Sequence, residues 1–360
     1  MLSTYVGATA IVAFTLSASF VAAVLKTARK HAWFDEPDER KIHTGQIPRL
    51  GGIGFSSAFV LVVALLTSFF PESLNGLTYH GRFMPVFFAM VLILAFGVLD
   101  DFRPLRPRWK LLVQIAAAIL VMTSDFGFHR LFFPGLGPSV ELGLIRYPIT
   151  LLWIVGVTNA VNLIDGVDGL AGGFSFIASV TLALIFFSAG NASVALLCVA
   201  LAFSVAGFLI FNLPLPRARI FMGDCGSQLL GFVLAVLPLL DNGSGGASLP
   251  LPYAAALLLI PIFDTFSAIW RRLRDGRRID SPDKSHMHHK LMVLGLDARG
   301  VDAVVWSLQA VLGLLVVLSL RSAGIVAGLA LCAAYVLGAG FFSAVHFLNR
   351  WKNENEGIPR

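Results

Sequence analysis

The chain alternates between long apolar runs and short polar connections. Most runs are about 17–25 residues long, close to the roughly 20 that a helix needs to cross a bilayer. The runs are continuous, whereas strands of a membrane barrel would alternate apolar and polar residues. The pattern predicts an all-α, polytopic integral membrane protein with about eleven transmembrane helices. The expected spans are residues 3–25, 51–70, 84–99, 109–124, 147–161, 170–189, 192–211, 226–240, 252–270, 303–320 and 324–347.

Lysines and arginines gather on alternate connections, and this predicts the orientation of the chain. Of the 27 basic residues, 23 lie within residues 26–50, 100–110, 212–224, 271–302 and 348–360. The opposite connections hold only Arg82, Arg130, Arg146 and Arg321. Because cytoplasmic loops carry the excess of basic residues, we expect the N-terminus outside and the C-terminus in the cytoplasm.

Composition supports a membrane protein and narrows the alternatives. Hydrophobic residues make up 57% of the chain and charged residues 13%, against about 25% charged residues in soluble domains. The net charge of +6 follows from the basic span ends, so it indicates no nucleic-acid partner. The three cysteines show neither a CxxC spacing nor a disulfide framework.

We expect the first run to remain as a span rather than act as a cleaved signal peptide. We also expect one membrane domain, residues 1–348, and a polar cytoplasmic tail at 349–360.

Carboxylates collect on the same face as the basic residues, which the topology rule does not explain. FGVLDDFRPLRPRWK places Asp100 and Asp101 at the end of the third span. Adjacent acids there could hold Mg²⁺ or accept a proton, or they could simply end a solvated helix. RIFMGDCGSQLLGF places Asp224 at a glycine turn into a helix, which suits a phosphate with a bridging Mg²⁺, or a plain N-cap. Asp264 lies inside the ninth span, as a functional acid or as the partner of a nearby arginine.

The stretch NAVNLIDGVDGLAGG repeats a polar residue every third position. Asn159, Asn162, Asp165 and Asp168 therefore share one side of a tight helical or turn segment. Oxygen ligands at this density suit Mg²⁺ or the hydroxyl groups of a sugar or nucleotide. The alternative is an Asx-rich turn between two helices, but a turn needs fewer such residues.

Two basic stretches could bind phosphate. RKIHTGQIPRLGG carries Lys41 and Arg49 before a glycine-rich helix start, either as ligands of phosphate or as ordinary topology residues. SHMHHKLM carries His286, His288 and His289. These histidines are too close together to surround a zinc ion easily. An anion-binding loop is favoured over a plain basic loop, with the imidazoles on the positive side of the site.

Together these groups predict a reaction. Carboxylates for a hard cation, basic groups for phosphates and apolar helices for a lipid indicate Mg²⁺-dependent transfer of a phosphorylated group from a soluble nucleotide donor to a membrane lipid phosphate. The rival from another class is a secondary transporter. Its polar site would lie near the bilayer midplane and would often accompany inverted repeats. Here the motifs collect at one face, and the sequence shows no repeat.

These motifs resemble those of the polyprenyl-phosphate N-acetylhexosamine-1-phosphate transferases, which include the phospho-MurNAc-pentapeptide translocases. The resemblance runs from HTGQIPRLGG through VLDDFRPL, NAVNLIDGVDGLAGG and FMGDCGSQLLG to SHMHHKLM. It implies transfer of a sugar 1-phosphate from a UDP-N-acetylhexosamine to undecaprenyl phosphate with release of UMP. The implied location is the cytoplasmic face of a bacterial inner membrane. The implied cofactor is Mg²⁺, for which Mn²⁺ could substitute, and a homodimer is an open expectation.

The resemblance also implies roles for the residues. Asp100 and Asp101 look like the catalytic aspartate pair, and Asp224 with Asp165 like the metal ligands. Donor or phosphate binding is implied for Asn162, Asp168, His286, His288, His289, Lys41 and Arg49. The histidines read His-Met-His-His rather than three in a row, and an arginine-rich loop precedes them. Both features look more like the branch that initiates O-antigen, common antigen or teichoic-acid linkage chains than like the muramyl-pentapeptide branch.

Overall fold

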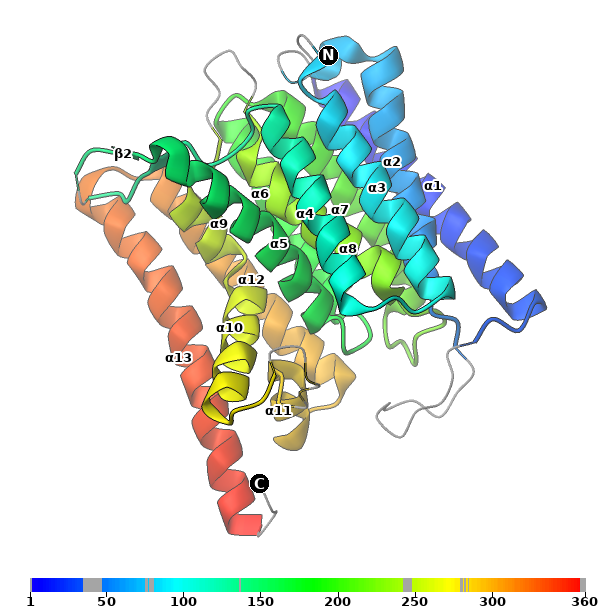
Figure 1. The fold of residues 1–360 in the computed structure, drawn as a ribbon, viewed down its shortest axis with the longest axis vertical. Helices are drawn as coiled ribbons and strands as arrows, with labels where there is room; N and C mark the ends of the chain where they lie inside the picture. Colours follow the sequence, from blue (N-terminus) through cyan, green and yellow to red (C-terminus); the bar gives the residue numbers. More distant parts are fainter. Residues whose placement is uncertain are drawn as a thin grey trace.

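Helices form nearly all of the chain that the computed structural model describes, namely residues 2–34, 47–74, 77, 81–135, 137–241, 248–278, 281, 283 and 285–356 (Figure 1). The α-helices are α1 (Leu2–Lys30), α2 (Gly51–Phe69), α3 (Met84–Phe102), α4 (Pro107–Thr123), α5 (Arg146–Ile164), α6 (Leu170–Ser188), α7 (Ala192–Asn212), α8 (Gly223–Val236), α9 (Leu251–Leu257), α10 (Leu259–Arg274), α11 (Met287–Val293), α12 (Ala298–Arg321) and α13 (Gly324–Glu356). Short 3₁₀ turns cover Pro71–Leu74, Gly143–Ile145 and Leu237–Leu239. A two-residue hairpin pairs β1 (Arg130–Leu131) with β2 (Val140–Glu141).

Eight helices of the described chain are long and apolar enough to cross a membrane, and the bent pair of α9 and α10 raises the number to nine. The eight are α1, α2, α3, α5, α6, α7, α12 and α13. Helices α4 and α8 occupy two further expected spans but have only 17 and 14 residues. The all-α, polytopic membrane fold is therefore confirmed, while a total of eleven crossings stays a prediction.

The expected ninth span is broken rather than straight. Helices α9 and α10 meet at Leu258 with an angle of 84°. Pro261 has no N–H with which to continue the helical ladder to the carbonyl of Leu257. Instead, Gln309 of α12 donates its Nε2–H to that carbonyl at 2.9 Å. The bend therefore leaves the Leu257 carbonyl satisfied, by a side chain instead of by the backbone.

Helix α8 lies at the centre of the fold. It packs against α2, α3 and α5, and every residue from Cys225 to Val236 is buried. Glycines let the neighbours approach closely: a Cβ at Gly97 of α3 would lie 2.6 Å from the Cα of Cys225. A Cβ at Gly231 would lie 2.7 Å from the carbonyl oxygen of Thr158 in α5. Such contacts fix the start of α8 against the ends of α3 and α5.

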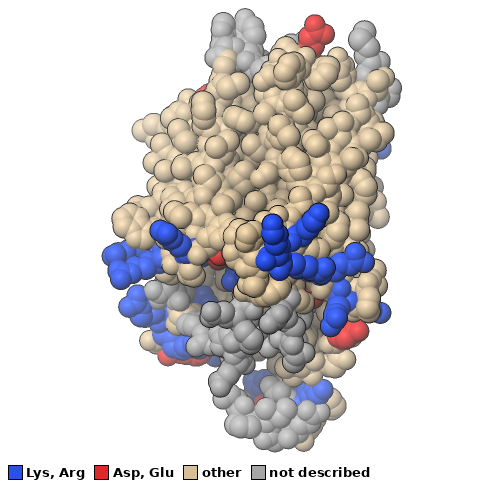
Figure 2. Space-filling view, turned by 90° about the vertical axis from the view of Figure 1, so that its right-hand side faces the viewer, with Lys and Arg blue, Asp and Glu red and all other residues tan. Residues whose placement is uncertain are grey.

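Charge divides the molecule along its length. Figure 2 shows lysine and arginine side chains gathered in the lower part of the view, below a broad surface of uncharged side chains. The basic ends of α1 and α10 each carry two or three such residues in their last turn. The grouping expected from the sequence is therefore present in the fold.

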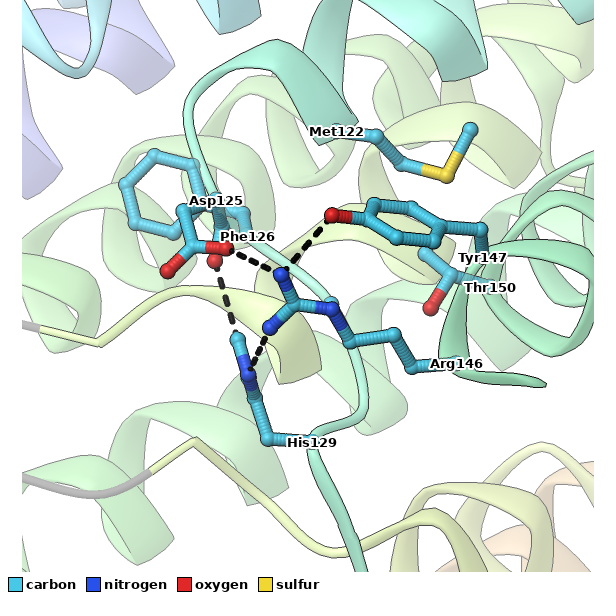
Figure 3. A pocket seen from close by; sticks show the side chains of 8 residues that line it. Met122, Asp125, Phe126, His129, Arg146, Tyr147 and Thr150 are labelled. Atoms are coloured by element: carbon cyan, nitrogen blue, oxygen red, sulfur yellow. Dashed lines mark hydrogen bonds and ion pairs between the residues drawn. The ribbon is translucent and has the colours of Figure 1, made fainter. Parts of the chain in front are cut away.

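A polar cluster closes the opposite end of the bundle, where α4 leads into α5 (Figure 3). The Arg146 guanidinium lies 2.9 Å from the Asp125 carboxylate and donates to the Tyr147 hydroxyl at 2.9 Å. His129 joins the cluster through Arg146 and the Asp125 carbonyl. The adjoining cavity has a volume of about 10 Å³, room for about one water molecule. The cluster therefore fastens the α4–α5 connection, and the cavity beside it is too small for a substrate.

Helix α13 does not stop where the polar tail was expected to begin. It continues through residue 348 to Glu356 without a break. Asn349 and Lys352 on this extension bond the backbone of α11. Most of the expected tail is thus a continuation of the last span.

Candidate active site

Asp224 stands at the start of α8, on the same end of the bundle as the basic residues. Its Oδ1 lies 3.3 Å from Arg49 Nη2 and accepts a hydrogen bond from Asn162 Nδ2 at 3.2 Å. Its Oδ2 accepts a hydrogen bond from Lys110 Nζ at 3.0 Å. Four segments far apart in the sequence thus meet at one carboxylate.

Gly223 makes this meeting possible. Its φ of +80° belongs to the left-handed region that favours glycine. A Cβ here would lie 2.5 Å from the carbonyl oxygen of Arg49 and 2.9 Å from both carboxylate oxygens of Asp101. The glycine before Asp224 therefore provides both the turn and the close approach.

The adjacent acids Asp100 and Asp101 serve different neighbours. Asp101 accepts the backbone N–H groups of Asp224 and Cys225 at 2.7 and 3.2 Å, so it caps the start of α8. Asp100 is 3% exposed, lies 2.5 Å from Lys110 Nζ and accepts the Leu105 N–H at 2.8 Å. Asp101 thus holds the helix that carries Asp224, and Asp100 holds the lysine that faces it.

Arg49 reaches the site through a short backbone pairing. The N–H of Phe221 bonds the carbonyl of Pro48 at 2.8 Å, and the N–H of Gly51 bonds the carbonyl of Phe221 at 2.8 Å. A Cβ at Gly52 would lie 2.3 Å from the Gly226 nitrogen, so the starts of α2 and α8 touch through their backbones. This explains the glycine pair after Arg49. Lys41, the other expected phosphate ligand of this stretch, lies outside the described residues.

The asparagine- and aspartate-rich stretch follows α5 into the site. Asn162 bonds Ser227 Oγ at 2.7 Å in addition to Asp224. Burial raises the pKa of Asp165 to about 7, with the nearby Asp224 and Asp168 adding to the shift and Arg49 opposing it. Asp168 is 8% exposed and lies deeper, near Asp302 of α12. The structure therefore brings Asn162 and Asp165 towards Asp224 and turns Asp168 into the bundle.

The histidines approach the same stretch from the other side. A Cβ at Gly166 would lie 2.4 Å from His288 Nε2, so helix α11 touches the loop after Asp165. The rings of His286 and His288 are parallel with centroids 6.0 Å apart, and the His288 and His289 centroids lie 4.3 Å apart. Burial lowers the pKa of His288 to about 3, so this imidazole is neutral at pH 7. His288 can therefore donate or accept a hydrogen bond in the fold, and the place of the histidines on the positive side of the site stays a prediction.

Asp264 has a different partner from the arginine that the sequence suggested. Its Oδ2 lies 2.8 Å from His286 Nδ1, and its Oδ1 accepts the N–H of Met287 at 2.8 Å. Arg271 instead pairs with Asp283 at 2.6 Å. Burial opposes ionisation of Asp283, but this pairing lowers its pKa.

Several polar residues of the site were not predicted from the sequence. Lys110 is the foremost, because it lies between Asp100 and Asp224. Its signal was present: it is a lysine at the start of a span, within the FGVLDDFRPLRPRWK stretch. Gln114 lies one helical turn further along α4, bonded to Asn159 at 2.6 Å and to Gln228 at 3.5 Å. These amides continue the polar site into the bundle.

The residues around Asp224 can be tested for their fit to Mg²⁺. Within the described ranges, no group of three or more His, Cys, Asp or Glu side chains is arranged to hold a metal ion. Mg²⁺, however, is usually bound by one or two carboxylates, waters and the phosphates of a substrate. Asp224 and Asp165 supply oxygen ligands close enough to influence each other electrostatically. This donor set fits an ion that arrives with a phosphorylated substrate.

Comparison with known proteins agrees with this site. Residues 83–241 match the family described as Glycosyl transferase family 4. A Bacillus subtilis (strain 168) protein named "Probable undecaprenyl-phosphate N-acetylglucosaminyl 1-phosphate transferase" is 37% identical over 276 residues, 77% of this chain and 74% of that protein. The Yersinia pestis "Undecaprenyl-phosphate alpha-N-acetylglucosaminyl 1-phosphate transferase" is 31% identical over 312 residues, 86% and 82% of the two chains. The Mycobacterium leprae (strain TN) "Decaprenyl-phosphate N-acetylglucosaminephosphotransferase" is 34% identical over 293 residues, 75% and 72%.

Proposed function

Since the chain belongs to glycosyl transferase family 4, in the group of polyprenyl-phosphate N-acetylhexosamine-1-phosphate transferases, we propose that it transfers N-acetylglucosamine 1-phosphate from UDP-N-acetylglucosamine to undecaprenyl phosphate. UMP is the second product, and the lipid-linked sugar starts a cell-surface glycan. The names of all three relatives support this sugar. They favour it over the muramyl-pentapeptide donor and over the transporter alternative.

One observation carries the proposal, which is the surroundings of Asp224. A carboxylate that faces Arg49, Lys110 and Asn162 at 3.0–3.3 Å can hold a cation on one side while the basic groups meet phosphate oxygens on the other. Phosphoryl transfer is catalysed mainly by such placement of charge around the reacting phosphorus. Lys110 and Arg49 supply this charge in the proposed mechanism, because they are the cations that lie beside Asp224.

The proposed reaction is a direct displacement. An oxygen of the lipid phosphate attacks the phosphorus attached to the sugar, and a new P–O bond forms. The bond from that phosphorus to the bridging oxygen breaks, and the electron pair leaves with UMP. Lys110 holds the attacking phosphate, with Asp100 fixing the lysine from behind.

Neither acid of the pair is placed as a nucleophile. Asp101 uses both oxygens on backbone N–H groups, and Asp100 is buried against Lys110. This arrangement supports direct attack over an aspartyl-phosphate intermediate. Both acids then serve catalysis by holding the groups that contact substrate.

Mg²⁺ is the proposed cofactor, with Mn²⁺ as a substitute. Asp224 and Asp165 would hold it, and it would neutralise charge on the donor pyrophosphate. Asn162 would fix Asp224 in place, and Asp168 would shape the donor loop from its buried position. His286, His288 and His289 would contact the donor as hydrogen-bonding groups.

The site is proposed to face the cytoplasm of a bacterial inner membrane, with the N-terminus outside and eleven crossings. The basic residues gathered on the site's end support this orientation (Figure 2). A soluble nucleotide donor then reaches the site from the cytoplasm, while the lipid reaches it from the bilayer.

An assay with purified protein tests the function. It needs undecaprenyl phosphate, Mg²⁺ and a panel of labelled UDP-sugars that includes UDP-N-acetylglucosamine, UDP-N-acetylgalactosamine and UDP-MurNAc-pentapeptide. We expect a lipid-linked product and stoichiometric UMP with UDP-N-acetylglucosamine. Preference for the pentapeptide would reassign the donor, and folded protein that transfers none of these sugars would overturn the proposal.

A further inference from the structure

Helix α11 carries the histidines, yet it is too short to be stable alone. It has seven residues, Met287–Val293, whereas isolated helices below about 12–15 residues are marginal in water. Met287, His288 and Leu291 are buried, so one side of the helix is anchored. Its ends also need hydrogen-bond partners, because a helix leaves its first N–H and last carbonyl groups unpaired.

The N-terminal end of α11 is held by α10. Asp264 accepts the N–H of Met287 with one oxygen and lies 2.8 Å from His286 Nδ1 with the other. The side chains of Asp264 and His286 are 2% and 7% exposed. Because a carboxylate only accepts, His286 carries its proton on Nδ1 and presents Nε2 as the remaining ring nitrogen. One buried acid therefore sets both the helix start and the tautomer of its first histidine.

The C-terminal end of α11 is held by the extension of α13. Asn349 Nδ2 donates to the carbonyl of Lys290 at 3.2 Å. Lys352 Nζ donates to the carbonyl of Val293 at 2.8 Å. Both carbonyls lie in the last turn of α11, where a positive charge is favourable. The Lys290 carbonyl also accepts the Leu294 N–H at 3.1 Å, so Asn349 adds a second hydrogen bond to it. The end of the chain thus caps a helix that is 59 positions earlier in the sequence.

We propose that Asp264 and the α13 extension are positioning elements that hold the histidine helix ready for the donor. The proposal rests on the proposed function for the identity of that donor. Asp264 acts through His286 rather than by contact with substrate. Asn349 and Lys352 act through the backbone of α11, which rests on the Asp165–Gly166 loop through His288.

The α13 extension is tested by the double variant Asn349→Ala/Lys352→Ala. Arg350→Ala is the matched control, because Arg350 lies between them and pairs within the helix, with Glu354 at 2.7 Å. We expect the double variant to raise KM for UDP-N-acetylglucosamine about three- to tenfold, since it loses two hydrogen bonds. KM for undecaprenyl phosphate and the behaviour of Arg350→Ala should match wild type. Equal effects on both KM values, or no effect on either, would overturn the positioning role of the α13 extension.

Asp264 is tested by a double-mutant cycle with His286. Asp264→Asn keeps an acceptor for the Met287 N–H but loses the charge that orients the imidazole. We expect kcat/KM for the donor to fall about tenfold in the wild-type background and less than twofold in His286→Ala. Losses that multiply independently would show that Asp264 does not work through His286.

Hydrogen exchange at Met287–Val293 supplies a readout that needs no turnover. The amides of α11 should exchange faster in Asn349→Ala/Lys352→Ala than in Arg350→Ala, while those of α8 stay unchanged. Unchanged exchange in α11 would overturn the positioning role, whatever the protein transfers. Absence of transfer in wild type, with faster exchange in the variant, would instead reject the proposed function alone.

Discussion

Asp224 shows how a single carboxylate can organise a polar site at the end of an apolar bundle. Its two oxygens face two cations and one amide that come from three other segments. A carboxylate with so many partners is fixed in direction, which suits a group that must meet a charged substrate. The neighbouring residues then determine how much transfer activity or stability each substitution removes.

Asp224→Asn should reduce transfer on the order of 100-fold or more, because the site loses the negative charge that the cofactor and both cations require. The protein should still insert and fold, since Asn keeps the size of the side chain. Initial rates over a range of Mg²⁺ concentrations measure the effect. Asp241→Asn is the control: this acid pairs with Arg82 at 3.1 Å near the opposite end. Near-normal transfer by Asp224→Asn would refute the metal assignment.

Gly223→Ala should impair both stability and transfer. A Cβ there meets the Arg49 carbonyl at 2.5 Å, and the φ of +80° is strained for alanine by about 1–2 kcal/mol. Gly81→Ala is a matched control, because Gly81 has a φ of +73° but no atom of the described residues lies within 4 Å of its Cβ position. Comparing the melting temperatures and transfer rates of the two variants separates the backbone strain of a positive φ from the steric clash of the added Cβ. Equal losses in both would show that the close approach does not matter.

His288 should make the protein less stable at acid pH. Its pKa is about 3 in the fold and 6.5 in the unfolded chain, so the unfolded chain binds the extra proton between these values. Stability therefore falls as the pH drops below 6.5, by at most about 1.4 kcal/mol per pH unit. Melting temperatures at pH 7.5 and 5.5 should differ less in His288→Gln than in wild type. His31→Gln, at an exposed position, should behave as wild type.

At the scale of elements, hydropathy predicted where helices lie but not how each is shaped. All eleven expected runs are helical in the structure. The break at Leu258 was not predicted, because it depends on two residues in different helices. Pro261 removes a hydrogen bond to the Leu257 carbonyl, and Gln309 of α12 replaces it. Nothing in the ninth run alone distinguishes a bent span from a straight one with a tolerated proline.

Gln309→Leu should destabilise the fold by about 1–3 kcal/mol, because the buried Leu257 carbonyl loses its donor. Leucine is close in size and apolar, so packing changes little. Unfolding of the purified protein in detergent, followed by its melting temperature, measures the cost. An unchanged melting temperature would mean that another group satisfies this carbonyl.

At the scale of the whole molecule, the gathering of the motifs at one end could be predicted, but their partners could not. The basic residues and the acidic motifs lie on the same set of alternate connections. Counting lysines and arginines per connection therefore predicted that both groups share one face of the membrane. Lys110 meets Asp224 across 114 positions of sequence. That pairing depends on how closely α3, α4 and α8 pack, which glycines such as Gly97 decide and hydropathy does not record.

The orientation of the whole chain can be measured directly. A green fluorescent protein fused after Arg360 should fluoresce, because the C-terminus is expected in the cytoplasm. Alkaline phosphatase fused in the connection near Arg321 should be active, because that connection is expected outside. The reverse pattern would place the site on the wrong face for a cytoplasmic donor.

The bend in the ninth span also links two positions in evolutionary terms. A residue other than proline at position 261 can donate its N–H to the Leu257 carbonyl. When position 261 is proline, the side chain at position 309 must donate to this carbonyl instead. A chain with Pro261→Ala could lose Gln309 at little cost, whereas a chain with proline could not. Among relatives, the two positions should therefore vary together. Their joint identity would sort the members with a broken ninth span from those with a straight one.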